Sequence, residues 1–523
     1  MASRGPYDSG GPTRREFLAR STAAFAALGA LGLGDGAQVG ARRHQAGAPI
    51  SPPSSAPAKP AGAASSAQEG VSPIAPSAGA YVRVPEAKVE VLAEADVLVC
   101  GGGPAGVAAA CAAARHGAKT ILIERWPFVG GMGTAALVNI WHLSDRRKVV
   151  IRGLVEEAVQ RAARRGWIAF RGSLDRHETH DFDPEGMKIV LHDMLEASGV
   201  RTICHLVAGE PLVDAGRIRG VLVDTKQGRR AILAKIVIDA TGDGDVAAKA
   251  GLPFEYGRQP DRLVQGMTMM YRVCGIDEAR LKALPPEVAK KVLAEMREAV
   301  RKGELPPFQP LFGLGHMRNR AIPNMCPVAG NPLSEEELTQ LTLKGRRQVF
   351  AYWEWLRGRL AGLEKVAIEQ TAFSLGVRES RRVCGLKTLT AEMVLGAAKQ
   401  PDAVGHGFWM IDIHDPKGTG YTTWNDRGPH NMLPAGQSYH IPLGMCLNRQ
   451  IPNLAVAGRC ASSTHEAHAS VRLQSHCMVM GQGVGTAAAL ALAQHIDMHQ
   501  VSLKKLQAQL RADGVYLEDV PSA

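Results

Sequence analysis

The chain has 523 residues, of which 45% are hydrophobic and 21% are charged, and its formal net charge is +11. This length is enough for two or three domains with a sizeable core, and the apolar content is ordinary for a globular protein. The basic residues are spread along the chain with no lysine-rich patch interleaved with aromatic residues, so nucleic-acid binding is not expected.

The first residues read as an export signal. Thr13 to Leu18 (TRREFL) matches the twin-arginine motif, and the apolar segment Ser21 to Gly34 that follows is shorter than the ~20 residues that span a bilayer. This pattern is typical of a signal h-region, with a candidate cleavage site after Ala41. We predict that residues 1–41 are a twin-arginine signal peptide, that the twin-arginine export machinery is a partner, and that the protein is periplasmic or extracellular. The alternative is a chance arginine pair before an alanine-rich helix.

Residues 42–92 are predicted to be a disordered linker. Most of this segment is rich in Ala, Pro, Ser and Gly and poor in large apolar residues, so it cannot bury enough surface to fold. No later segment is expected to form a stable membrane span.

A nucleotide-binding unit begins directly after the linker. Asp96 to Cys100 is an apolar, β-branched run typical of a buried parallel strand. The glycines that follow give the pattern G-x-G-x-x-G: Gly101 allows a tight turn, Gly103 lets the backbone approach a pyrophosphate, and Gly106 lets a helix pack on the strand.

The rest of the unit agrees with this interpretation. Pro104 to His116 is alanine-rich and predicted to be helical, with its N-terminus facing the phosphate. Lys119 to Ile123 is a second strand and ends in Glu124, whose carboxylate suits a ribose hydroxyl. Strand, turn, helix, strand and acid in this order predict a dinucleotide site, whereas an ordinary βαβ unit with a glycine turn is the alternative.

Three further segments favour FAD over NAD. A glycine-rich loop, Arg125 to Thr134, stands where an NAD domain would start its next helix. Lys235 to Thr241 and Asn453 to Arg459 are short apolar strands, and a long predicted helix containing Gly481 follows the second of them. A nucleotide domain assembled from distant parts of the chain is what an extended flavin dinucleotide needs.

These motifs carry a resemblance to a known family. They are GGGPAG at 101–106, ERWPFVGGMGT at 124–134, DATGDGDVAAKAG at 239–251, FSLGVRESRRVCG at 373–385, YHIP at 439–442 and the run from Asn453 to Ala489. Through them the chain resembles the FAD-dependent oxidoreductases of the glutathione-reductase-like flavin fold, in the family that includes the flavin-binding part of heterodisulfide reductase. The resemblance covers roughly Ala95 to Gly514.

The resemblance implies a non-covalent FAD held by particular residues. The glycine turn would hold the pyrophosphate, Glu124 and Arg125 would flank the adenosine ribose, and segments near Gly458 would border the ribityl chain and ring. The implied cofactor-binding residues are Gly101, Gly103, Pro104, Ala105, Gly106, Glu124, Arg125, Gly131, Thr134, Thr241, Gly242, Gly458, Arg459, Gln474, Gly481 and Gly483.

The predicted fold class is α/β. It is a Rossmann-like FAD-binding domain of the glutathione-reductase type, built from residues 93–251 and 439–514, with an inserted α+β substrate domain at 252–438. Within the first part, residues 142–200 are predicted to be a helical excursion, and within the insert a long helix is predicted from Ser334 to about Gly362.

Several chemistries lack the residues that they need. No cysteine pair four residues apart follows Glu124, so a thiol–disulfide enzyme is not expected, and a second dinucleotide motif is missing. A 4Fe–4S cluster has support only from the family resemblance, because the nine cysteines show no ferredoxin-type spacing. No metal site is predicted, since His465 and His468 do not form an H-E-x-x-H motif.

Five residues are candidates for catalysis. His465, His468 or His476 would take a proton from a substrate while flavin accepts a hydride, because imidazole titrates near neutral pH. Arg378 and Arg472 would bind a carboxylate or stabilise an anionic reduced flavin. The alternatives are histidines that only hydrogen-bond to the backbone or flavin, and arginines in structural salt bridges.

The sequence therefore predicts an exported FAD-dependent oxidoreductase that transfers a hydride between flavin and a small organic substrate, with an unidentified electron acceptor. Two alternatives remain open: a flavin electron-transfer subunit that serves a partner protein, and a flavoprotein in which FAD is structural.

Overall fold

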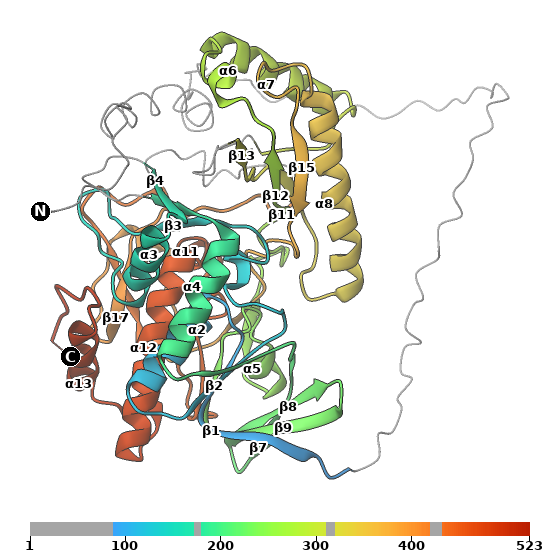
Figure 1. The fold of residues 1–523 in the computed structure, drawn as a ribbon. Helices are drawn as coiled ribbons and strands as arrows, with labels where there is room; N and C mark the ends of the chain where they lie inside the picture. Colours follow the sequence, from blue (N-terminus) through green and yellow to red (C-terminus); the bar gives the residue numbers. More distant parts are fainter. Residues whose placement is uncertain (1–86, 172–178, 310–318, 419–430, 523) are drawn as a thin grey trace, which may run out of the picture. The chain divides into compact units, whose positions relative to one another are not determined.

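A computed structural model describes residues 87–171, 179–309, 319–418 and 431–522 (Figure 1). The predicted signal peptide and residues 42–86 of the predicted linker lie outside the described residues. The described residues from Val89 onward belong to one compact unit, while a second unit, Gly34–Lys88, lies almost wholly outside the described part.

A mostly parallel sheet forms the centre of this unit. Its parallel strands are, in spatial order, β6 (Arg201–Cys204), β2 (Thr120–Glu124), β1 (Glu90–Cys100), β9 (Gly228–Asp239) and β19 (Leu454–Val456). The other half of β9 continues into an antiparallel meander with β8 (Arg217–Thr225) and β7 (Ala208–Asp214). A strand from near the C-terminus thus completes a sheet begun near the N-terminus, as the sequence predicted.

Strand β1 begins at Glu90, six residues before the predicted start and inside the segment predicted to be linker. Its first half pairs with β9 but is largely exposed, and Glu90 forms an ion pair with Arg230 at 3.2 Å. The sequence did not reveal this half because it lacks the continuous apolar run of a fully buried strand.

Helices α2 (Pro104–Arg115) and α12 (Gln474–Gln494) pack against each other beside this sheet (Figure 1). Glycines permit the contact: a Cβ at Gly481 would lie 2.0 Å from the carbonyl oxygen of Ala105, and one at Gly485 would lie 2.2 Å from that of Ala109. Among the helices that the structure describes, α12 alone has the length and apolar composition of a membrane span, and 83% of its apolar window is buried inside the protein.

The segment 142–200 is not purely helical, contrary to the prediction. It contains helices α3 (Leu154–Arg164) and α4 (Pro184–Ala197), but also strands β4 (Ile168–Arg171) and β5 (Thr179–Phe182), which form an antiparallel sheet with β3 (Ile140–His142). These strands are short, and short strands leave no local pattern in the sequence by which they could be predicted.

A second hydrophobic core lies in the middle of the chain and draws on Leu137 and residues between Met267 and Leu375. Its strands are β11 (Met267–Met269), β12 (Tyr271–Cys274), β13 (Arg320–Ala321), β14 (Cys326–Val328) and β15 (Ala367–Thr371), and its helices are α6 (Glu278–Lys282), α7 (Pro286–Arg301) and α8 (Glu335–Leu356). Helix α8 starts at the predicted cap, where the Ser334 hydroxyl accepts a hydrogen bond from the Glu337 N–H, but it ends six residues before Gly362.

The insert is therefore shorter than the predicted 252–438. Buried apolar residues between Val383 and Ile413, and Leu433, pack into the first core with the sheet and α12. The elements responsible are β10 (Phe254–Tyr256) paired with β16 (Arg381–Val383), and β17 (Ala403–Gly407) paired with β18 (Tyr439–Pro442). These pairings join segments far apart in the sequence, so local patterns could not place the boundary.

The remaining described elements complete the first core. They are α5 (Asp245–Lys249), α9 (Ala391–Leu395), α11 (His465–Val471), α13 (Leu503–Ala512) and the 3-10 turns Gly131–Gly133, Leu443–Cys446 and Met498–Gln500.

Candidate functional site

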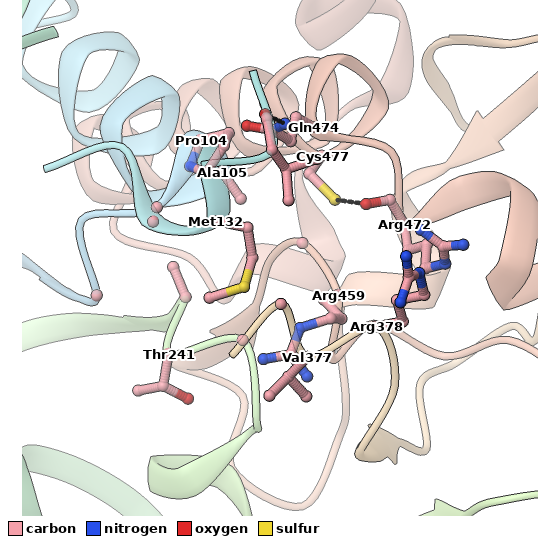
Figure 2. Close-up of a pocket in the computed structure, with 18 of the residues that line it drawn as sticks. Pro104, Ala105, Met132, Thr241, Val377, Arg378, Arg459, Arg472, Gln474 and Cys477 are labelled. Carbon is pink, nitrogen blue, oxygen red and sulfur yellow. Dashed lines mark hydrogen bonds between the residues drawn. The ribbon is translucent and has the colours of Figure 1, made fainter. Parts of the chain in front are cut away.

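A cavity of about 530 Å³ lies at the carboxyl ends of the parallel strands, where ligands bind in open α/β sheets. It is lined by the start of α2, the end of β2, the start of α12, Met270 of the second core, and Thr268 and Asn324 from the same part of the chain. Both cores thus contribute to one cavity (Figure 2).

The glycine turn before α2 forms one wall of the cavity. Gly101 has φ +107°, and a Cβ there would lie 2.4 Å from the carbonyl oxygen of Ala240. By contrast, a Cβ at Gly103 would meet only the Cα of Gly131, at 4.0 Å. Gly103 is also the N-cap of α2 and provides no side-chain cap, so the first N–H groups of the helix are available to an anion.

Glu124 is held at the adjoining wall by its own backbone neighbours. Its Oε2 accepts a hydrogen bond from the Gly102 N–H at 2.6 Å, and its Oε1 accepts one from the Trp126 N–H at 2.9 Å. Burial raises the pKa of Glu124, although these two N–H groups oppose the shift. The carboxylate oxygens keep lone pairs for a ligand hydroxyl.

The start of α12 provides a second helix N-terminus at the same cavity. Its N-cap residue, Leu473, offers no side-chain hydrogen bond, and Leu473, Gln474 and Cys477 line the cavity. Gln474 is held by its Nε2, which donates to the carbonyl oxygen of Val138 at 2.5 Å. Two uncapped helix N-termini, with the carboxylate at the end of β2, suit an extended dinucleotide whose pyrophosphate is anionic and whose ring gains negative charge on reduction.

Polar side chains gather where the cavity meets the second core. Arg378 Nη1 donates to Thr268 Oγ1 and to the carbonyl oxygen of Gly266, both at 2.7 Å. Arg472 Nη2 donates to the carbonyl oxygen of Asp412 at 3.0 Å. The charges of both arginines lower the pKa of Asp412, and Figure 2 draws both on the side of the view away from Pro104 and Ala105.

The carboxyl group of Asp412 and the imidazole of His414 complete this end of the cavity, with Asp412 Oδ2 3.5 Å from His414 Nε2. Burial raises the pKa of Asp412, but His414, Arg472 and Arg378 outweigh it, so this pKa is lowered overall. Burial, with the charge of Arg378, lowers the pKa of His414 to about 4. At neutral pH Asp412 is therefore ionised and His414 is neutral.

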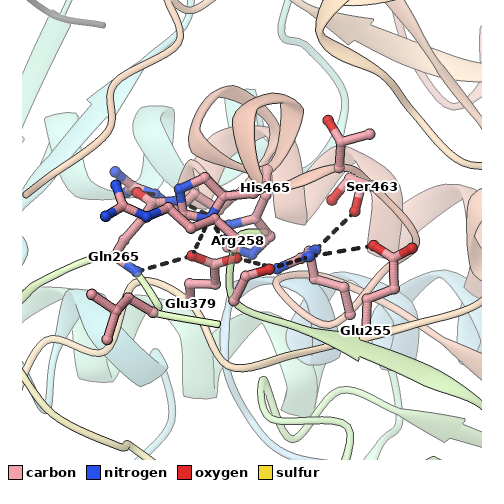
Figure 3. A network of polar contacts seen from close by, with 12 residues as sticks. Glu255, Arg258, Gln265, Glu379, Ser463 and His465 are labelled. Carbon is pink, nitrogen blue, oxygen red and sulfur yellow. Dashed lines mark hydrogen bonds and ion pairs between the residues drawn. The ribbon is translucent and has the colours of Figure 1, made fainter. Parts of the chain in front are cut away.

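Glu379, which is fully buried, organises the layer behind the cavity (Figure 3). It forms an ion pair with Arg382, lies 2.8 Å from His465 Nδ1, and accepts a hydrogen bond from the Gln265 N–H at 2.9 Å. Gln265 in turn links this network to the cavity, because its Oε1 accepts from Arg472 Nε at 3.3 Å.

Most residues that the sequence assigned to the cofactor line the cavity. They are Gly101, Gly103, Pro104, Ala105, Glu124, Arg125, Gly131, Thr241, Gly242, Gly458, Arg459 and Gln474. Four others do not, and each has a packing role instead. A Cβ at Gly106 would lie 1.8 Å from the Gly101 carbonyl oxygen. Gly481 packs against α2, and Gly483 packs against Val404. The Thr134 hydroxyl donates a hydrogen bond to the Val129 carbonyl oxygen at 2.9 Å.

The three candidate histidines lie outside the cavity lining, contrary to their predicted role. His465 is paired with Glu379, while His468 Nε2 bonds to the carbonyl oxygen of Arg459 at 2.9 Å. His476 is fully buried, and its Nδ1 bonds to the carbonyl oxygen of Ser470 at 3.0 Å. Each of the three rings is held by a partner inside the protein, which agrees with the alternative that these histidines are structural.

The arginine cluster GVRESRR divides between two roles. Arg381 forms an ion pair with Asp245 at 2.8 Å, and Arg382 forms one with Glu379. Arg378 lines the cavity, as does Arg472. Arg459 also lines it but is held by Asp243 at 2.8 Å and by the Ser380 hydroxyl at 2.9 Å.

Sequence reasoning missed a stretch that lines the cavity, Trp409 to His414. Met410, Asp412 and His414 line the cavity, whereas Ile411 and Ile413 between them are buried in the first core. From Met410 to His414, cavity-lining residues and core residues alternate, and this period of two is the pattern in the sequence that could have predicted the stretch. Trp409 stacks on His142 with ring centroids 3.7 Å apart, and both rings line the same end of the cavity.

All nine cysteines fall within the described ranges, and none forms a disulfide. In those ranges no three His, Cys, Asp or Glu side chains are grouped as a metal site would need.

Several known proteins are similar to this chain. A thiamine thiazole synthase from Sulfolobus acidocaldarius is 27% identical over 271 residues, which are 49% of this chain and 88% of that protein. Among solved structures, a p-nitrophenol 4-monooxygenase from Pseudomonas putida DLL-E4 is 11% identical, with 82% of this chain and 87% of that chain covered and a TM-score of 0.43. The myxobacterial chondrochloren halogenase is 14% identical, with 80% and 78% covered and a TM-score of 0.42.

Residues 96–510 match the family described as FAD dependent oxidoreductase. Because the match spans most of the chain, this protein belongs to the FAD dependent oxidoreductase family and is an enzyme.

Proposed function

We propose that this enzyme binds FAD non-covalently in the cavity and transfers a hydride between the flavin and a small organic substrate held against the second core. One observation carries the proposal: a single cavity extends from the glycine turn and Glu124 to Thr268 and Asn324 of the inserted segment. The cavity therefore brings the glycine turn and the inserted segment to one space, as a site for a cofactor and a substrate requires.

In this arrangement the chain's own residues position the cofactor. The uncapped start of α2 binds the pyrophosphate, the carboxylate of Glu124 accepts hydrogen bonds from the adenosine ribose, and the start of α12 faces the ring. The bound flavin supplies the two-electron redox step.

We further propose that His414, rather than one of the three predicted histidines, handles the proton. His414 lines the cavity and is neutral at neutral pH, so its ring can accept a hydrogen bond from a substrate hydroxyl or amine and take the proton as the hydride leaves, although its lowered pKa makes it a weaker base than a free imidazole. Asp412, 3.5 Å away, orients this ring.

The first experiment follows the absorbance of the purified protein anaerobically as alcohols, sugars, amines and hydroxy acids are added. Bleaching of the flavin bands by one class would support the proposal and identify the substrate side. A yellow protein that only a partner protein bleaches would favour an electron-transfer subunit, and one that no donor reduces would favour a structural FAD. A colourless protein that cannot be reconstituted with FAD would overturn the proposal.

We also propose that the flavin domain is of the glutathione-reductase type, related to the flavin-binding part of heterodisulfide reductase. The support is the motif set at 101–106, 124–134 and 453–489, together with a parallel sheet that runs into an antiparallel meander through β9. The proposal includes no 4Fe–4S cluster.

Export by the twin-arginine route is a separate proposal, supported by the motif Thr13 to Leu18 and the apolar segment after it. We expect the protein in the periplasmic or extracellular fraction and expect a double variant, Arg14→Lys with Arg15→Lys, to remain in the cytoplasm. Equal distribution of both proteins between the fractions would contradict this proposal.

A further inference from the structure

We infer that the hydroxyl of Thr268 and the side-chain amide of Asn324 form a pair of hydrogen-bond donors that binds a carbonyl-type oxygen of the substrate. Such an oxygen occurs in ketones, amides and carboxylates. The inference deepens the proposed function and rests on it, since it concerns the part of the cavity that the inserted segment forms. Both residues line the cavity.

Strands β11 and β14 place the two residues. Thr268 is the middle residue of β11, opposite Pro327 of β14, and Asn324 stands two residues before β14. Both backbone groups of Thr268 bond to Gly376: the Thr268 N–H donates to its carbonyl oxygen at 3.4 Å, and the Gly376 N–H donates back to that of Thr268 at 2.9 Å. These pairings hold the Thr268 side chain in a fixed place on the cavity wall.

Arg378 determines how both side chains are turned. Its Nη1 donates to Thr268 Oγ1 at 2.7 Å, and its Nη2 donates to Asn324 Oδ1 at 3.4 Å. A guanidinium group has only donors, so the oxygen of each partner must face it. The Thr268 hydroxyl proton and the Asn324 Nδ2 are therefore directed away from Arg378, and any further partner of Arg378 leaves this direction unchanged.

These two donors have no acceptor in the part of the chain that the structure describes: no hydrogen bond there starts from the Thr268 hydroxyl or from Asn324 Nδ2. Thr268 is only 1% exposed, Asn324 is partly exposed, and the apolar side chains of Met270 and Val377 line the same cavity. A poorly hydrated donor without an acceptor costs free energy, and a ligand oxygen would recover it.

The donor pair selects for a particular kind of ligand atom. Thr268 and Asn324 are neighbours, because they bond to the two terminal nitrogens of one guanidinium group. A carbonyl or carboxylate oxygen can accept two hydrogen bonds and carries no proton of its own, whereas an ammonium group can accept none. A site built to bond such an oxygen discriminates against a compound of the same shape that lacks it.

The test measures binding of small compounds to the purified holoprotein by calorimetry. Acetophenone is compared with α-methylstyrene, and cyclohexanone with methylenecyclohexane, since the members of each pair share a shape and differ in the acceptor oxygen. Benzoate beside benzamide distinguishes a carboxylate from a neutral carbonyl group. We expect at least one ketone to bind more tightly than its hydrocarbon counterpart.

Asn324→Asp is the sharpest variant, because it keeps an oxygen facing Arg378 but replaces the N–H groups by a second oxygen. We expect Asn324→Asp and Thr268→Val each to weaken binding of the ketone about three- to tenfold and to leave the hydrocarbon unchanged. Thr268→Ser keeps the hydroxyl and should bind the ketone as the parent does. In infrared difference spectra, the carbonyl stretch of bound acetophenone should lie at higher frequency in the two weakened variants, because fewer donors contact its oxygen.

Thr339→Val and Asn319→Asp are the matched controls. Thr339 is exposed on α8, where its hydroxyl donates to the Glu335 carbonyl oxygen, and Asn319 is exposed just before β13. Both control variants should bind the ketone as the parent does. Thermal melting of each variant separates loss of binding from loss of folding, and Asn324→Asp decides the outcome if Thr268→Val does not fold.

Two outcomes would overturn the donor pair: no ketone binds more tightly than its hydrocarbon counterpart, or the Thr268→Val and Asn324→Asp variants change both members of a pair equally. FAD content and reduction by light are measured on the same samples. A protein that holds reducible FAD and shows either outcome refutes the donor pair alone, whereas a protein without FAD refutes the proposed function.

Discussion

At the scale of single residues, neighbours in the same motif have different tasks. Gly103 leaves open space in the cavity, whereas a Cβ at Gly106 would collide with the Gly101 carbonyl oxygen. Arg378 faces the cavity, while Arg382, four residues on, forms an ion pair with the buried Glu379. A motif therefore identifies the segment that forms a site, but the surroundings of each side chain decide which members contact the ligand.

Glu124 provides the first prediction at this scale. We expect Glu124→Ala to lower the affinity for FAD at least about tenfold, because it removes a ribose acceptor and leaves the Gly102 and Trp126 N–H groups without their partner. FAD released from the protein is measured by its fluorescence as a function of protein concentration. Glu157→Ala, at a partly exposed ion pair with Arg115, is the control, and an unchanged affinity in Glu124→Ala would contradict the assignment.

His476 provides a prediction of pH dependence. Burial lowers its pKa from 6.5 to about 4. Between these values the unfolded chain binds a proton that the folded protein does not, so stability falls as the pH drops from 6.5 to 4. The expected loss is about 3 kcal/mol of unfolding free energy.

The variant His476→Asn tests this effect, because its amide N–H can still donate to the Ser470 carbonyl oxygen. Denaturant unfolding of both proteins at several pH values should show the difference between them narrowing as the pH falls. A difference that stays constant from pH 6.5 to 4 would exclude His476 as a source of acid sensitivity.

At the scale of elements, the contact between α2 and α12 decides whether two uncapped helix N-termini reach the same cavity. The helices approach closely because Gly481 and Gly485 stand opposite the backbone of Ala105 and Ala109. The alanine-rich sequence predicted both helices, but neither helix by itself indicates the other as its partner.

We expect Gly485→Ala to force the two helices apart, since the new methyl carbon would lie 2.2 Å from the Ala109 carbonyl oxygen. The unfolding free energy should fall by about 1–3 kcal/mol, as in overpacked cores, although alanine favours helices more than glycine does. Denaturant unfolding measures the change, and Gln494→Ala at the exposed end of α12 is the control. A more stable Gly485→Ala protein would show that the helices can separate at little cost.

At the scale of the whole molecule, one cavity draws on two hydrophobic cores, so a ligand in it would connect them. Removal of FAD from the purified protein is expected to lower its melting temperature, and added FAD should restore it. A ligand at about a thousand times its Kd contributes about 4 kcal/mol to the folded state. Scanning calorimetry with and without FAD tests this, and identical melting temperatures would contradict binding to the folded state.

The sequence by itself determined the strand, turn and helix from Asp96 onward, the acid at Glu124 and the return of the chain to this domain near its C-terminus. Each of these depends on hydrophobic periodicity or on glycine stereochemistry, which act over a few residues. It also indicated Arg378 and Arg472 as candidates.

Only the tertiary structure decided the limits of the insert, the burial of His465, His468 and His476, and the place of Asp412 and His414 beside the arginines. These properties depend on pairings such as β16 with β10, whose partners are more than a hundred residues apart. The burial and charge of a side chain are set by whatever packs against it, and a local pattern of residues does not contain that information.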